Sequence, residues 1–504
     1  MGAAAGKRET SRRARLTARA VVALLTTAPV LAQQAPQAGA TTELDWLRYE
    51  LGRRMRAFEL DYAEAGAEAR ARALPELEAA VASFFQVDFQ RAASAIDSAR
   101  RALESAEAVD DAARRWADGL ALVPERRCVE PGTGAVELAL DVFGKERNAV
   151  RPEGELRLRA ALVQADGTRR GELLEPIGEL PATFRLAFED LAEGDGTLQA
   201  AIELDGRELS RGVQTLSAVR DGVKRLSATF SASTKTRSAE LALEASSLRG
   251  LYSLARPILE GHACETDVPV ARLLVEAEQM ASSLELGEPW LNATRAGEHW
   301  LRVPLESNVQ PVRLSIPPPS STPHSSPEGL RPLVVALHGA GGSENLFFDG
   351  YGAGLAVQLA KERGWYFVAP RAGLLEAPNV AELVDALAER LPIDRVKVVL
   401  IGHSLGADHG LQVLARETPC AAAALLSGGW LARATPAMQP IPFWLGAGER
   451  DFGLLPTRQL AESLRAAGVE RVELREFPAV EHMAVVQVAL PEVYAFFDRE
   501  LAGR

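Results

Sequence analysis

Short apolar runs alternate with helix-like segments in the last third of the chain. The runs cover residues 332–339, 365–370, 396–402, 421–429, 441–448 and 471–477. Stretches with helical spacing, such as 354–363 and 457–467, lie between them. Short runs of this kind are typical of strands buried on both faces. Their alternation with helices predicts a mostly parallel sheet with helices on both of its faces.

Two earlier regions carry the helical period instead. In residues 43–125 apolar side chains recur at helical spacing with charges between them, and Leu74-Pro75 interrupts the pattern. We therefore expect a new helix from Glu76 to about Ser105. Residues 220–290 return to the helical pattern.

A period of two residues separates these helical regions. Alternating segments cover 135–143, 155–167, 183–188 and 196–206, and turn pairs such as Asp205-Gly206 punctuate them. Short alternating strands at this spacing predict a small β-sandwich of about the length of an immunoglobulin-like domain. Its residues include no cluster that would require a metal or catalysis.

We expect a multidomain protein, because 504 residues exceed the length of one typical domain. The predicted segments are a signal peptide (1–32), a helical region (33–130), the β-sandwich (131–220), a second helical region (221–300) and the α/β domain (301–504). Residues 317–329 are rich in Pro and Ser, which is typical of an exposed loop or tether.

The first 32 residues have the composition of an export signal. Arg12, Arg13, Arg15 and Arg19 precede an apolar stretch from Ala20 to Leu31, and small residues before position 33 predict cleavage after Ala32. The stretch is too short for a permanent membrane span. We therefore expect a periplasmic or extracellular protein. Ser11-Arg12-Arg13 also resembles a twin-arginine signal, so the sequence leaves the export route open.

Charge and cysteine content narrow the function classes. A formal net charge of −12 argues against a general nucleic-acid binder. Cys128, Cys264 and Cys420 lie far apart and form no CxxC pair, so they indicate neither a zinc site nor a disulfide framework. A single bridge between Cys128 and Cys264 is left open for an oxidising compartment.

The candidate chemistry centres on "GHSLG", where the run 396–402 meets a helix-like segment, 407–416. Gly402 and Gly406 are small enough for a tight turn that lifts the Ser404 hydroxyl out of the strand. A serine hydroxyl needs a base to become a nucleophile. Asp451 and then His482 follow, each just after a predicted strand, in the chain order that this turn has when it is catalytic. Glu449 is the alternative acid.

A glycine-rich stretch, "LHGAGGSEN" at 337–345, supplies the remaining part of an acyl-transfer site. Its backbone N–H groups, from Gly339 or Ala340, are expected to form an oxyanion hole together with that of Leu405. His338 is expected to shape this loop. His403, Asp408 and His409 are expected to serve packing. No metal or organic cofactor is required.

Residues 331–504 resemble the catalytic domain of the α/β-hydrolase superfamily. "LHGAGG", "GHSLG", "GAGERD" and "VEHM" stand where that superfamily has its oxyanion loop, nucleophile turn, acid and base. The short domain is similar to secreted esterases of the feruloyl esterase and polyhydroxyalkanoate depolymerase kind, and to peptidases of the prolyl oligopeptidase-like group. The resemblance implies an exported serine hydrolase that acts on small-molecule or polymeric esters.

Two alternatives stay open. One is a serine peptidase, which is second because a propeller-bearing peptidase needs a much longer N-terminal β region. The other is a non-catalytic binding or scaffold protein with a vestigial hydrolase domain. No long cap interrupts the chain between 421–429 and Asp451, which predicts an open site.

Overall fold

The computed structural model describes residues 43–143, 150–189, 191–235, 238–262, 264–318, 329–416, 419–430 and 433–502. The predicted signal peptide and most of the Pro/Ser-rich segment lie outside the described residues. Contacts between Cα atoms divide the chain into two compact units. Of the described residues, unit 1 contains 77–87 and those from 291 onward, and unit 2 contains 43–76 and 88–290.

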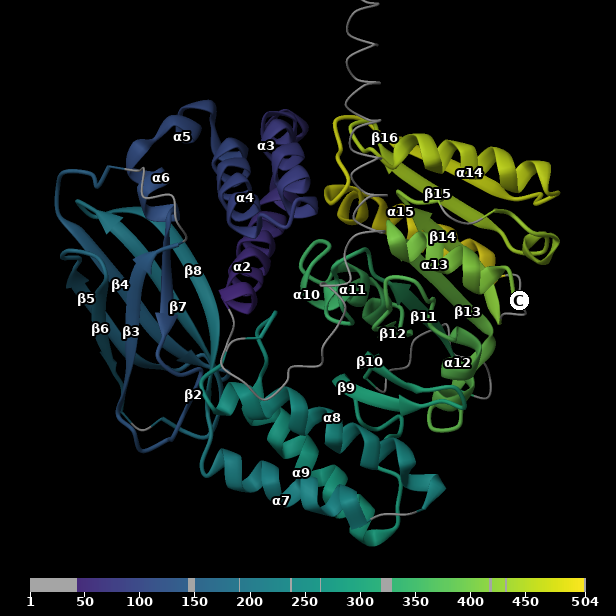
Figure 1. The fold of residues 1–504 in the computed structure, drawn as a ribbon, viewed down its shortest axis with the longest axis horizontal. Coiled ribbons are helices and arrows are strands. Elements are labelled where there is room, and N and C mark those ends of the chain that lie inside the picture. The colour runs from purple at the N-terminus through teal and green to yellow at the C-terminus, as the bar shows by residue number, and fades with distance from the viewer. Residues whose placement is uncertain are drawn as a thin grey trace, which may run out of the picture. The chain divides into compact units, whose positions relative to one another are not determined.

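Unit 1 is built on an eight-stranded sheet (Figure 1). Its strands are β9 (Gly297–Pro304), β10 (Val309–Ile316), β11 (Arg331–Leu337), β12 (Tyr366–Pro370), β13 (Ile393–His403), β14 (Cys420–Leu426), β15 (Phe443–Gly448) and β16 (Val472–Phe477). The order is β16-β15-β14-β13-β11-β12-β10-β9. Strands β11 to β16 pair in parallel, and β10 is antiparallel to both β12 and β9. The predicted mostly parallel sheet is confirmed.

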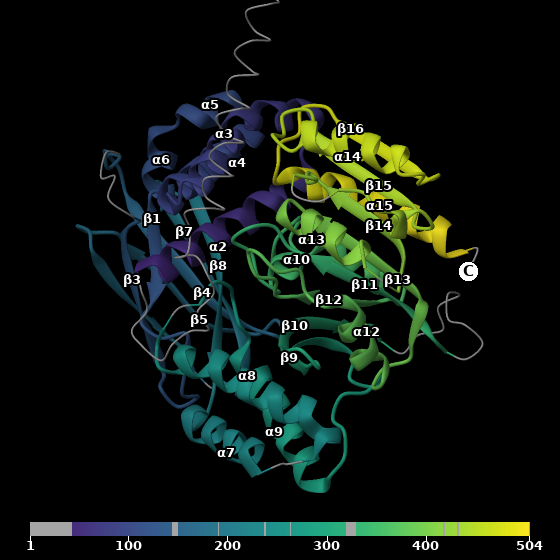
Figure 2. The ribbon, with the colours of Figure 1, turned by 45° about the vertical axis from the view of Figure 1, so that its right-hand side comes forward.

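Helices on both faces of this sheet explain its apolar strands (Figures 1 and 2). Side chains of the central strands, such as Val334, Val335, Leu400 and Ile401, are fully buried. Only a sheet covered on both sides buries consecutive residues in this way. The helices that follow β11 in the chain are α10 (Leu346–Asp349), α11 (Leu355–Glu362), α12 (Val380–Ala388), α13 (Leu405–Leu414), α14 (Leu454–Ala466) and α15 (Ala484–Ala502).

The first two strands of the sheet were not predicted. Strand β9 begins at Gly297, inside the range expected to be helical, and β10 follows after a short turn. Pro304 ends β9 and Pro311 lies within β10. Proline lacks the N–H group of a sheet ladder and is a weak strand signal. The two prolines therefore weakened the strand pattern of this antiparallel pair at the edge of the sheet.

Unit 2 contains two further sheets, of three and five strands. The strands are β1 (Leu120–Pro124), β2 (Cys128–Val129), β3 (Ala135–Val142), β4 (Leu156–Gln164), β5 (Arg169–Pro176), β6 (Ala182–Ala187), β7 (Gly194–Leu204) and β8 (Arg207–Ala218). The orders are β1-β3-β6 and β2-β8-β7-β4-β5. Buried residues of both sheets, including Leu138, Leu186, Leu158 and Leu216, belong to one hydrophobic cluster. Strand β1 lies within the range expected to be helical, because its pairing with β3 overrides local pattern.

The helices that precede β9 in the described chain are α2 (Glu43–Glu64), α3 (Ala67–Phe85), α4 (Phe89–Glu104), α5 (Ala106–Asp110), α6 (Ala112–Asp118), α7 (Gly222–Lys235), α8 (Ala242–Leu259) and α9 (Val270–Leu286). The predicted break at Pro75 is wrong, because α3 continues through this residue. Proline removes one hydrogen bond from the helix. Burial of Ala73 and Leu77 on either side of it favours continuation. No helix among the described residues is long and apolar enough to cross a membrane.

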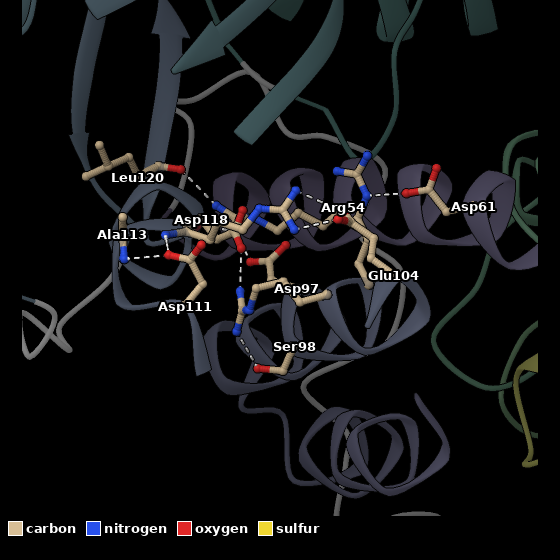
Figure 3. A network of polar contacts seen from close by, with 12 residues as sticks. Arg54, Asp61, Asp97, Ser98, Glu104, Asp111, Ala113, Asp118 and Leu120 are labelled. Atoms are coloured by element: carbon tan, nitrogen blue, oxygen red, sulfur yellow. Dashed lines mark hydrogen bonds and ion pairs between the residues drawn. The ribbon is translucent and has the colours of Figure 1, made fainter. Parts of the chain in front are cut away.

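A polar network joins helices of unit 2 to its sheet (Figure 3). The Arg54 guanidinium donates to the carbonyl oxygens of Asp118, at 2.6 Å, and Leu120, at 3.0 Å, and pairs with Asp97. It also lies over the Phe143 ring, 4.5 Å from the centroid. A buried cation is stable only when its donors have partners, so this network fixes α2 against the start of β1.

The three cysteines of the chain are free thiols in the structure. The bridge between Cys128 and Cys264, which the sequence left open, is not formed. Burial raises the pKa of both thiols to about 12.

Strand β15 passes close to the loop that precedes α15. A Cβ atom placed on Gly448 would overlap the carbonyl oxygen of Val480 and lie 3.2 Å from the Glu481 nitrogen. We expect Gly448→Ala to lower the free energy of unfolding by about 1–3 kcal/mol, the usual cost of overpacking. Urea unfolding followed by circular dichroism measures this change.

The matched control is Gly132→Ala, since Gly132 lies in an exposed turn and its Cβ would meet nothing within 4 Å. An equal loss of stability in the two variants would contradict the proposed close approach.

Candidate active site

Ser404 occupies a strained turn between β13 and α13. Its backbone has φ 55° and ψ −121°, which few residues other than glycine adopt. The neighbouring chain leaves no room for side chains here. A Cβ atom on Gly402 would overlap the Gly406 carbonyl oxygen, and one on Gly406 would overlap that of Leu337. The two glycines thus allow the turn, and the turn presents the Ser404 hydroxyl beyond the carboxyl end of β13.

The structure brings Ser404, His482 and Asp451 into one hydrogen-bonded chain. His482 Nε2 lies 3.0 Å from Ser404 Oγ, and His482 Nδ1 lies 2.8 Å from Asp451 Oδ1. A carboxylate only accepts hydrogen bonds, so Nδ1 carries the proton and Nε2 is free to accept from the hydroxyl. The three residues are 6%, 2% and 6% exposed, respectively, which limits competition from water.

Asp451 is held as a carboxylate by more than His482. The Gly453 N–H donates to Oδ1 at 2.6 Å, and the Ser427 hydroxyl donates to Oδ2. Burial acts to raise the pKa of Asp451, but the attraction of His482 and these hydrogen bonds outweigh it, so the pKa lies below its ordinary value. The alternative acid, Glu449, has an exposed side chain.

Ser427 is a site residue that the sequence analysis missed. It directly follows the buried strand β14 and has φ 53°. Its place at the carboxyl end of a parallel strand was the available signal, since ligands and site residues collect at that edge.

The three predicted oxyanion donors differ in their surroundings. The Gly339 N–H donates to the Tyr351 hydroxyl at 3.4 Å and is therefore engaged within the protein. The N–H groups of Ala340 and Leu405 have no acceptor among the residues that the structure describes. Leu405 is also the first residue of α13, where helix N–H groups lack helical partners and the helix dipole favours negative charge.

His338 supports the candidate oxyanion loop, residues 337–345, through two hydrogen bonds. Its Nδ1 donates to the Gly339 carbonyl oxygen at 2.9 Å, and its Nε2 accepts the Ala372 N–H at 3.0 Å. The ring is buried and spans two loops. This arrangement agrees with the expectation that His338 shapes the loop.

His403 links the oxyanion loop to the base, which is more than the packing role expected of it. Its Nε2 lies 2.9 Å from the His482 carbonyl oxygen, so Nε2 donates and Nδ1 accepts from the Tyr351 hydroxyl at 2.7 Å. Burial lowers the pKa of His403 to about 3, assisted by the nearby His482. A neutral His403 therefore fixes the backbone position of His482.

Glu481 directly precedes His482 and caps the start of α15. Its carboxylate accepts the N–H groups of Met483 and Ala484, each at 2.7 Å, at the start of α15. Burial raises the pKa of Glu481 to about 7. His409 and Asp408 lie on α13, fully enclosed, and burial lowers the pKa of His409 to about 4.

No family model and no curated protein sequence matches the chain. Similar solved structures include a ferulic acid esterase, at 14% identity over 41% of this chain and 97% of that chain, with a TM-score of 0.34. A bacterial heroin esterase is 19% identical over 46% and 91% of the two chains, with a TM-score of 0.34. The Staphylococcus aureus fluorophosphonate-binding serine hydrolase F is 15% identical over 40% and 97%, with a TM-score of 0.33. They are esterases and serine hydrolases, as are the proteins that the sequence motifs resemble.

Replacing Ser427 tests the support of the acid. We expect Ser427→Ala to lower kcat/KM for an ester about tenfold or more, because a hydrogen bond to a charged group contributes about 1.5–3 kcal/mol. Steady-state kinetics measures the change. Ser463→Ala on α14 is the control and should retain the wild-type value. Unchanged kinetics of Ser427→Ala would show that Asp451 does not depend on this donor.

His403 predicts a specific dependence of stability on pH. Its pKa is about 3 in the folded protein and ordinarily 6.5, so the unfolded chain binds a proton that the folded protein rejects between these values. This contribution to stability is complete above pH 6.5 and is lost as the pH falls toward 3, by at most about 1.4 kcal/mol per pH unit.

We expect the difference in unfolding free energy between wild type and His403→Gln to shrink steadily from pH 6.5 to pH 4. Urea unfolding at several pH values measures it. Glu481 titrates in both proteins and cancels in the difference. A difference that does not vary with pH would contradict a neutral, buried His403.

Proposed function

We propose that the protein is an exported serine hydrolase that cleaves carboxylic esters through an acyl-enzyme intermediate. The observation that carries this proposal is the hydrogen-bonded chain from Asp451 through His482 to Ser404, with Ser404 at a strained turn. Packing alone requires none of these contacts in this combination. A base within reach of a serine hydroxyl, itself oriented by a third group, is the arrangement that activates a nucleophile.

In the proposed reaction, Ser404 Oγ attacks the ester carbonyl carbon while His482 Nε2 takes the hydroxyl proton. The tetrahedral oxyanion is stabilised by the N–H groups of Ala340 and Leu405. The ester C–O bond then breaks, and His482 gives its proton to the departing alcohol. Water attacks the acyl-enzyme by the same steps, which releases the acid and restores Ser404. Asp451 stabilises the imidazolium in both halves.

An ester substrate is favoured over a peptide by the architecture of the N-terminal half. The described strands outside the hydrolase domain, β1 to β8, form two sheets of three and five strands. A propeller needs at least four blades of four strands each. The peptidase remains the second candidate, since the same chemistry cleaves amides. The scaffold alternative is disfavoured by the complete set of polar contacts around Asp451.

We further propose export to the periplasm or beyond, on the basis of the arginines and the apolar stretch in residues 1–32. We also propose a β-sandwich module that includes residues 131–220 and lies between mainly helical segments of the chain. The hydrophobic cluster shared by two sheets supports the sandwich. The acyl-transfer chemistry needs no cofactor.

Labelling with a fluorophosphonate probe tests the nucleophile. We expect the wild type to be labelled and Ser404→Ala to remain unlabelled, with ester hydrolysis reduced about 10⁶-fold, as when the nucleophile of a comparable triad is removed. Ser253→Ala, on an exposed part of α8, is the control. Equal labelling of wild type and Ser404→Ala would reject Ser404, and an unlabelled wild type would favour the scaffold alternative.

A panel of p-nitrophenyl esters and aminoacyl anilides then separates the two enzyme candidates. The proposal predicts a higher kcat/KM for the esters.

A further inference from the structure

Two adjacent phenylalanines of helix α3 reach the candidate active site. The second half of α3 belongs to the same compact unit as the hydrolase sheet, although it lies more than two hundred residues before that sheet in the sequence. The Phe85 ring centroid lies 6.1 Å from that of His482. A Cβ atom on Gly341, in the oxyanion loop, would lie 3.0 Å from Phe84 Cζ. The pair therefore contacts both the base and the oxyanion loop.

An ion pair holds this part of α3 at the acid-bearing loop. Arg450 Nε lies 2.7 Å from Glu78 Oε1, and Arg450 Nη2 lies 3.3 Å from Glu78 Oε2. Arg450 directly precedes Asp451, and Phe452 directly follows it. The pair is half exposed and contributes little stability. Its two parallel hydrogen bonds nevertheless define where the helix lies along the loop.

Aromatic rings enclose the imidazole on the side of the acid loop. Phe452 stacks on His482 with centroids 4.0 Å apart and planes 27° apart. Phe85 meets Phe452 edge to face at 5.5 Å, and Trp430 stacks on Phe452 at 5.9 Å. Trp430 also lies 6.4 Å from the His482 ring. Phe84, Phe85 and Trp430 are only partly buried, so they keep surface available for a ligand.

The position of these rings relates them to the departing alcohol. In the proposed reaction His482 Nε2 delivers its proton to the alcohol oxygen as the ester C–O bond breaks, so the alcohol group lies next to the imidazole. Groups that border His482 therefore border the alcohol rather than the acyl chain. Aromatic side chains favour flat apolar partners, through burial of apolar area and through edge-to-face or offset stacking.

We infer that Phe85, with Phe452 and Trp430, forms an aromatic wall that selects esters of aromatic or other bulky apolar alcohols over esters of short alkyl alcohols. This inference rests on the proposed function. Phe85 is thus a specificity-determining residue supplied by α3, and Phe84 extends the wall toward the oxyanion loop.

The test compares two acetate esters that share an acyl group, phenyl acetate and ethyl acetate. For each ester the ratio of kcat/KM between variant and wild type cancels the different reactivity of the two alcohols. We expect Phe85→Ala to lower kcat/KM about threefold to tenfold more for phenyl acetate than for ethyl acetate, the range that an aromatic contact supplies. Fluorophosphonate labelling should persist, because Ser404, His482 and Asp451 are retained.

Two further substitutions of Phe85 and one control variant test whether the effect depends on the aromatic ring. Phe85→Trp keeps an aromatic ring and should restore the preference for phenyl acetate. Phe85→Leu keeps apolar bulk and serves if Phe85→Ala does not fold; it should show the same selective loss. Phe230→Ala removes a partly buried phenylalanine in unit 2 and should change neither ester.

Equal losses for both esters, or no loss for either, would overturn the inference while leaving the proposed function intact. Failure of the proposed function has a different signature, a wild type that neither labels nor cleaves either ester.

Discussion

The candidate site depends on one close approach, that of the turn after β13 to the end of β11. The backbone at Gly406 lies so near the Leu337 carbonyl oxygen that no side chain fits between them. This proximity allows Ser404 its unusual backbone angles and places the start of α13 beside the oxyanion loop. Hydroxyl, helix terminus and glycine loop are thus positioned by the same contact. Rigid elements hold such groups more accurately than mobile loops do.

A second layer of polar residues connects the loops that carry the reactive groups. Tyr351 and His403 connect the oxyanion loop to the backbone of His482, whereas Ser427 and Gly453 hold the carboxylate that orients its ring. All of these groups lie in a poorly solvated region, where hydrogen bonds are strong and unmet ones are costly. The site therefore forms as a unit, and removal of any one of these hydrogen bonds is expected to weaken the others.

Much of the α/β sheet of unit 1 could be predicted because buried parallel strands leave a strong sequence pattern. The six apolar runs correspond to β11 through β16, and the mostly parallel sheet follows from their alternation with helices. Ser404, Asp451 and His482 could be found because each lies within five residues after the end of such a strand. Strands β9 and β10 could not, since an antiparallel edge pair with prolines lacks that pattern.

Other features depend on tertiary contacts that no local pattern records. The passage of α3 through Pro75 depends on burial around Ala73 and Leu77, and β1 depends on its pairing with β3. Ser427, Tyr351 and Phe85 are ordinary residues in the sequence. Their importance comes only from what the fold places against them.

Helix α3 has a consequence for how the chain can be dissected. A fragment that begins at residue 301, the predicted start of the α/β domain, would retain Ser404, Asp451 and His482 yet lose Glu78, Phe84 and Phe85. It would also lose the first half of β9, the edge strand of the sheet. The segment that contains Ser404, Asp451 and His482 is therefore smaller than the compact unit to which these residues belong, because that unit also includes residues 77–87. The inferred role of Phe85 predicts that substitutions in a distant N-terminal helix alter substrate preference without any change in residues 301–504.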